Sequence, residues 1–162
     1  HESPRRGSNF VTNKVVKNSV KISLGLERFL EVGNIYSYRD WGHAKDYVRM
    51  QWLMLQQDKP EDYVIATGKQ YSIRTFINIV CKKLNIKIKW IGKGIKEKGL
   101  DSKKKQTIIE IDKNYFRPLD VNTLLGNAAK AKKKLKWRPK YNIDSLIDEM
   151  ISEEINIINE NK

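Results

Sequence analysis

Apolar residues recur at helical spacing in several stretches of the chain, separated by Gly, Pro and polar residues. Ser8 and Asn9 are candidate N-caps of the first predicted helix, which ends at Gly25. In the second, Val48, Trp52 and Leu55 share the predicted apolar face with Ala44. The predicted helices span residues 11–24, 44–55, 73–84, 127–135 and 143–158.

Short apolar runs between these helices predict strands at residues 29–32, 63–66, 86–90 and 107–112. Tyr63–Ala66 is a compact apolar run followed by Thr67-Gly68, which is typical of a strand buried in a parallel sheet. Residues 92–106 are rich in Gly and Lys and predict a mobile surface loop. Alternating helices and strands indicate an α/β fold.

The composition is that of a soluble globular domain, with 162 residues, 40% hydrophobic and 31% charged. No apolar run approaches the roughly 20 residues that span a bilayer, so we expect no membrane partner. The single cysteine, Cys81, lies in a helical stretch, where a small core residue is the favoured interpretation. It fits a reducing, cytoplasmic setting.

The first residues, His1 to Gly7, are polar and turn-forming and do not begin with Met. We therefore expect this chain to be a fragment of a longer protein.

A net charge of +13 supports two interpretations. A basic surface can bind nucleic-acid phosphates. However, Lys far outnumbers Arg, although Arg is the preferred residue for bidentate phosphate contacts. The densest run, Lys130 with Lys132–Lys134, covers about one helical turn and fits a solvated face. We expect no nucleic-acid partner, and keep a basic nucleic-acid-binding module as the alternative.

Several catalytic signatures are absent from the sequence. Gly92-x-Gly94 lacks the third glycine of a dinucleotide-binding loop, and no phosphate-binding Gly-Lys-Ser/Thr follows it. No Tyr is followed four residues later by Lys, which excludes a Tyr-x-x-x-Lys acid–base pair. Two histidines and one cysteine, far apart, make a metal site unexpected. We therefore assign no catalytic residue in this chain.

Isolated arginines are the strongest candidate binding residues. Arg5-Arg6 precedes a predicted helix, Arg39 lies between a loop and a helix, and Arg117 follows a strand next to Pro118. Guanidinium groups grip phosphate oxygens in pairs, so converging arginines would suit a diphosphate. Alternatively, each pairs with a nearby carboxylate, such as Asp40 or Asp120, to fix a loop.

Longer motifs make the sequence similar to a known family. They include His1–Gly7, Arg39–Val48, Trp52–Gln57, Pro60–Gly68, Tyr115–Pro118, Leu124–Gly126 and Ala131–Leu135. In this order they resemble the C-terminal part of the GDP-mannose 4,6-dehydratases. The resemblance covers nearly the whole chain and is weakest at residues 92–105 and after residue 149.

The resemblance implies the C-terminal part of an extended short-chain dehydrogenase, with an NAD(P)-binding Rossmann-like fold. Such enzymes convert GDP-D-mannose to GDP-4-keto-6-deoxy-D-mannose and water, with NADP as the internal hydride carrier, and form dimers or tetramers. The NADP-binding half and the catalytic Tyr and Lys would lie upstream. Residues 41–85 would pack partly on that half, and residues 86–162 would form the substrate-binding domain.

Site roles follow from the resemblance, position by position. His1 and Arg6 would bind NADP, whereas GDP-mannose would contact Val11, Lys14, Asn34, Arg39, Arg117 and Asp120. Asp120 stands where the family usually has Glu, so its contact with the ligand could need a bridging water. For Trp41 and His43 we favour packing over substrate contact. Cut off from an upstream half, the chain would be inactive and prone to self-association, and a non-catalytic remnant is a further alternative.

Overall fold

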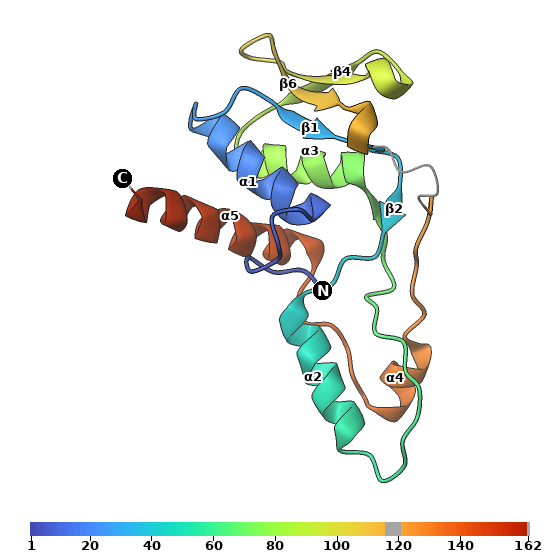
Figure 1. Cartoon of the computed structure of the whole chain (residues 1–162). Helices are drawn as coiled ribbons and strands as arrows, with labels where there is room; N and C mark the ends of the chain where they lie inside the picture. Colours follow the sequence, from blue (N-terminus) through green and yellow to red (C-terminus); the bar gives the residue numbers. More distant parts are fainter. Residues whose placement is uncertain (116–120, 162) are drawn as a thin grey trace.

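A computed structural model describes residues 1–115 and 121–161 of the chain. One four-stranded sheet, in the order β1-β6-β5-β4, organises its upper part (Figure 1). The strands are β1 Leu30–Val32, β4 Ile88–Ile91, β5 Lys98–Asp101 and β6 Gln106–Ile111. β1 pairs with β6 in parallel, with Leu30 opposite Ile109, and the other two pairings are antiparallel. The strands predicted near residues 29–32, 86–90 and 107–112 are therefore present.

Three helices form the main core with this sheet. They are α1 Val11–Ser23, α3 Ile73–Lys83 and α5 Ile143–Glu160. α1 contacts both α3 and α5, and all three lie on the same side of the sheet in Figure 1. Val15, Ile77 and Ile147 are fully buried between them. Cys81 belongs to this core, and burial raises the pKa of its thiol to about 12, which fits a packing role.

Two of these helices begin where side chains cap their first turn. The Ser72 hydroxyl accepts a hydrogen bond from the Thr75 backbone N–H at 3.0 Å, and Asn142 forms a capping box with Ser145. In α1 the prediction was wrong: the N-cap is Phe10, without a side-chain cap, rather than Ser8 or Asn9.

The segment predicted as a mobile loop, residues 92–106, instead forms a hairpin. A 3₁₀ turn, η1 Gly94–Lys96, leads into β5, which pairs with both β4 and β6. Gly92 has φ +80, and a Cβ there would lie 2.5 Å from the Lys96 carbonyl oxygen. The turn therefore requires the glycine that composition alone had associated with flexibility.

A smaller region, which we call the arm, comprises residues 44–69 and 124–141. It holds α2 Ala44–Leu55 and α4 Ala129–Lys134, both separate from the sheet in Figure 1. Its own core is built on Met50 and Trp137, both fully buried. The Trp137 indole N–H donates to the Asp46 carbonyl at 3.0 Å, and the Asp46 carboxylate accepts the backbone N–H of Tyr141 at 2.9 Å. These hydrogen bonds attach residues 137–141 to α2.

The apolar face predicted for α2 is the exposed one. Val48, Trp52 and Leu55 are 59%, 58% and 81% exposed, whereas Tyr47 and Met50 are buried. Periodicity detected an apolar face correctly but could not tell whether this chain covers it.

The segment 63–66, predicted as a strand, has no strand partner among the described residues. It runs beside Gly126, where a Cβ would lie 2.2 Å from the Ala66 Cβ. A strand needs a neighbour to share its backbone hydrogen bonds, and none of the described strands lies next to it.

A two-stranded sheet joins the arm to the main core: β2 Tyr38–Arg39 pairs antiparallel with β3 Tyr71–Ser72. A last 3₁₀ turn, η2 Lys113–Tyr115, follows β6. Across the described parts of the chain, no helix has the length and apolar character needed to cross a bilayer.

Candidate functional site

A cavity of about 690 Å³ opens between the start of α1, the end of β1 and the turn after β6. Four of the predicted substrate-binding residues line it: Val11, Lys14, Asn34 and Arg39. They come from segments that are separate in sequence and that the fold brings to one place. We call this cavity the cleft.

Local geometry explains why these side chains converge. Val11 and Lys14 are three residues apart in α1, so they project from neighbouring turns of one face. Asn34 follows directly on β1 and Gly33. A Cβ on Gly33 would lie 2.3 Å from the Tyr115 carbonyl oxygen. The absence of a side chain at Gly33 lets the end of β1 lie against Tyr115 and so narrows the cleft.

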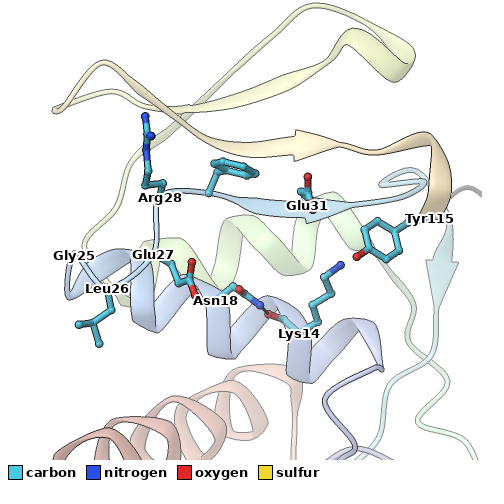
Figure 2. A pocket seen from close by; sticks show the side chains of 9 residues that line it. Lys14, Asn18, Gly25, Leu26, Glu27, Arg28, Glu31 and Tyr115 are labelled. Atoms are coloured by element: carbon cyan, nitrogen blue, oxygen red, sulfur yellow. Dashed lines mark hydrogen bonds between the residues drawn. The ribbon is translucent and has the colours of Figure 1, made fainter. Parts of the chain in front are cut away.

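Lys14 and Tyr115 form one wall of the cleft. The Lys14 ammonium lies 3.4 Å from the centroid of the Tyr115 ring, a cation–π contact. Figure 2 shows the two side chains pointing toward each other. A second cavity of about 410 Å³, bounded by the loop at Gly25 and by Glu31, is also lined by Lys14 and Tyr115. The pair therefore contributes to both cavities.

Arg39 is held by backbone carbonyl groups at the rim of the cleft. Its Nη1 donates to the Tyr38 carbonyl at 2.8 Å and to the Val121 carbonyl at 2.6 Å. The adjacent Asp40 carboxylate accepts hydrogen bonds from the backbone N–H groups of Thr67 and Gly68, at 3.0 and 2.9 Å. Asp40 thus fixes the turn at 67–68.

The two residues expected to bind the cofactor, His1 and Arg6, lie on the segment before α1. The Arg6 guanidinium stacks 3.4 Å above the ring of Phe10, whose side chain also lines the cleft. The Arg6 Nε atom lies 3.8 Å from Glu2 Oε1 and is buried without a hydrogen-bond partner among the described residues. The His1 ring meets Tyr47 edge to face, with centroids 4.8 Å apart.

The remaining predicted site residues, Arg117 and Asp120, lie outside the described residues. The sequence interpretation missed other cleft-lining residues: Phe10, Asn18, Asn114 and Tyr115. Two signals were available. Asn18 is four residues after Lys14 on the same helical face, and Tyr115 begins the Tyr-Phe-Arg-Pro motif.

Trp41 and His43 have packing roles, as the sequence interpretation favoured. Trp41 contacts the ring of Phe76 in the core at 4.9 Å between centroids. His43 is 2% exposed, and its Nε2 lies 2.7 Å from Glu149 on α5. Its Nδ1 accepts the backbone N–H of Lys45 at 3.0 Å and so caps α2.

Part of the lysine run is paired with acid. Glu61 contacts Lys130 at 2.8 Å and Lys134 at 2.5 Å, and these two lysines lower the pKa of its carboxyl to about 2. Glu61 thereby offsets part of the positive charge of α4.

Comparison with solved structures places this geometry in a known class. The fold resembles RMD from Pseudomonas aeruginosa, complexed with NADPH, with a TM-score of 0.78, 18% identity, and coverage of 97% of this chain and 46% of that one. It also resembles dTDP-glucose 4,6-dehydratase from Bacillus anthracis, with a TM-score of 0.71, 18% identity, and coverage of 95% and 41%. The fold is therefore that of the C-terminal part of an extended short-chain dehydrogenase, Rossmann-like and α/β.

Sequence comparisons identify the family within this class. The model of the family described as GDP-mannose 4,6 dehydratase matches residues 1–150, and the chain belongs to that family. It is 48% identical to a GDP-mannose 4,6-dehydratase of Vibrio cholerae, over 97% of this chain and 45% of the relative. It is 44% identical to the human GDP-mannose 4,6 dehydratase, over 99% of this chain and 43% of the relative. The chain thus spans a little under half the length of these relatives.

Proposed function

We propose that this chain is the sugar-nucleotide-binding part of a GDP-mannose 4,6-dehydratase. The complete enzyme would convert GDP-D-mannose to GDP-4-keto-6-deoxy-D-mannose and water, a step toward GDP-fucose and related deoxysugars. The observation that carries the proposal is the convergence of Val11, Lys14, Asn34 and Arg39 on one cleft in a chain of this family. Lys14 and Arg39 supply positive charge for a diphosphate.

The segment before α1 fits NADP. A guanidinium whose Nε has no hydrogen-bond partner among the described residues, in a side chain that is still 29% exposed, is suited to a phosphate, and Arg6 has this arrangement. Bound NADP would supply the hydride acceptor and donor. This chain's part is to hold the cofactor through Arg6 and His1, and to bind the nucleotide end of the substrate in the cleft.

The arm would complete its packing on a cofactor-binding half. Residues 41–85 include the exposed apolar face of α2 and the unpaired segment 63–66, which together suit a helix and an edge strand of a Rossmann sheet. Catalytic Tyr and Lys residues would come from that half, so the chain alone would be inactive. The complete enzyme would be a cytoplasmic homodimer or homotetramer.

Calorimetric titration of the folded chain with GDP-mannose, UDP-glucose and a short DNA duplex tests the binding proposal. We expect saturable binding of GDP-mannose only. Because each charged hydrogen bond to phosphate is worth about 1.5–3 kcal/mol, Lys14→Ala and Arg39→Ala should each weaken binding by about tenfold or more. Lys132→Ala, on the exposed side of α4, is the matched control and should leave binding unchanged.

Two results would contradict the proposal. One is binding of the DNA that disappears at high salt and is lost in Lys132→Ala, with no response to GDP-mannose. The other is equal affinity for GDP-mannose and UDP-glucose, which would leave the nucleotide preference unexplained.

A further inference from the structure

Glu97 is a buried carboxylate outside the cleft, and it joins three separate elements. It follows η1, between β4 and β5, and is 3% exposed. One of its oxygens lies 3.1 Å from Arg74 Nη2 at the start of α3. The other accepts a hydrogen bond from the Tyr36 hydroxyl. The Arg74 guanidinium lies 4.8 Å from the ring centroid of Trp90 on β4, which completes what we call the Glu97 cluster.

The cluster is attached to the loop at residues 33–37, which begins at the cleft. Within this loop, the Asn34 side-chain oxygen accepts the Tyr36 backbone N–H at 3.0 Å. The Arg74 backbone N–H donates to the Ile35 carbonyl at 2.9 Å. Tyr36 and Arg74 therefore each join Glu97 to the loop: each has one side-chain contact with Glu97 and one backbone hydrogen bond to a loop residue. Asn34 lies at one end of the loop, and Arg39 follows two residues after its other end.

The energetics favour a rigid arrangement. A buried carboxylate is stable only while its charged and hydrogen-bonded partners stay in place, so moving the loop would remove the Tyr36 hydrogen bond from a buried oxygen of Glu97 and leave only the Arg74 pair. Tyr36 is 48% exposed, so packing alone does not fix its side chain. The hydrogen bond to Glu97 is also the main cause that raises the pKa of Tyr36 above its usual value.

We propose that Glu97 is a positioning residue of the cleft. Through Tyr36 and Arg74 it fixes the loop at 33–37 and so sets where Asn34 and Arg39 meet the nucleotide diphosphate. The proposal rests on the nucleotide-binding function proposed above. It gives the β4–β5 hairpin a role in ligand binding, although no residue of that hairpin lines the cleft.

A double-mutant cycle on GDP affinity tests this in the whole chain. Tyr36→Phe keeps the ring and removes only the bond to Glu97, and we expect it to weaken GDP binding by about tenfold. In an Asn34→Ala background the same change should cost only about threefold, because one of the two residues it positions is gone and only Arg39 remains. In a Lys14→Ala background it should still cost about tenfold, because Lys14 is held by α1 instead. A purely structural role would give equal losses in both backgrounds.

Hydrogen exchange of the ligand-free chain gives an independent readout. We expect amide exchange in residues 33–39 to rise about tenfold in Tyr36→Phe and Glu97→Gln. Lys98→Met is the control: it breaks an exposed pair with Glu110 at 2.8 Å on the same hairpin and should change neither exchange nor affinity.

Unchanged exchange in the loop, or equal losses of affinity in both backgrounds, would overturn the proposal. If the unsubstituted chain does not bind GDP, the proposed function fails. The positioning role in binding falls with it, and the exchange result then shows separately whether Glu97 orders the loop.

Discussion

The two regions of the molecule differ in how much of their apolar surface they cover themselves. In the main core, Val15, Ile77 and Ile147 are fully enclosed by α1, α3, α5 and the sheet. The arm encloses Met50 of α2 and Trp137, but Trp52 and Leu55, which also lie on α2, remain open to solvent. The cleft is built almost entirely on the first region. A cleft can thus form on one region of a chain whose other region still presents an uncovered face.

The largest expected effect comes from matched truncations in the two cores. Ile77 and Met50 are both 0% exposed. Ile77→Ala should lower the free energy of unfolding by about 2–5 kcal/mol, since it opens a cavity in the main core. Met50→Ala should lower the free energy of unfolding by less than half of that amount, because the arm can open locally.

Chemical denaturation followed by circular dichroism, together with hydrogen exchange of α2, measures both effects. Equal losses of stability would mean that the arm and the main core unfold as one unit, which would contradict the comparison.

A smaller effect is expected at the joint between the regions, where Glu149 on α5 meets Lys45 and His43 at the start of α2. Hydrogen bonds from Lys45, and then from His43, hold the pKa of Glu149 below its ordinary value of 4.5. The stability gained from a lowered carboxyl pKa is present above about pH 4.5 and is lost as the pH falls through the lowered value.

We therefore expect Glu149→Gln to cost about 1 kcal/mol at pH 7 and to flatten the acid limb of the stability profile. Melting curves between pH 3 and pH 7 measure this. Glu153→Gln, on the next turn of α5 and exposed, is the matched control. Identical pH profiles for Glu149→Gln and the parent chain would show that the joint carries no stability.

The smallest effect on stability, and a clear one on association, is expected at the exposed face of α2. Trp52→Gln with Leu55→Gln should change the free energy of unfolding by no more than about 0.5 kcal/mol. The same pair should reduce self-association of the chain in sedimentation experiments, because an exposed apolar face favours contacts between copies. A parent chain that is already monomeric at high concentration would remove the reason for treating this face as an interface.

Much of the main core could be predicted from spacing, because α1, α3 and α5 each bury one apolar stripe within this chain. The arm could not. The apolar face at Trp52 and the strand-like run at Val64 both have the right composition, but among the described residues the face is exposed and the run has no strand partner. Local patterns describe what a segment needs and not what lies next to it.

The candidate site was predictable to a similar extent. Single motifs indicated Lys14 and Arg39, whereas Tyr115 required knowledge that β1 ends against the turn after β6. The Gly and Lys residues after Gly92 are typical of a loop and gave no signal for the β4–β5 hairpin, but in this chain they form the turn η1 and the inner strand β5. Glu97 therefore carried no signal in the sequence, although it is among the most buried charged residues described.

The parallel pairing of β1 with β6 has a consequence for the order of folding. Residue 30 lies opposite residue 109, so joining these strands closes a long loop, which costs chain entropy and slows folding. Chains are synthesised from the N-terminus, and Lys14 and Asn34 therefore emerge long before Tyr115. Lys14 and Tyr115 can meet only once the segment through residue 115 has left the ribosome, which makes the cleft a late product of synthesis.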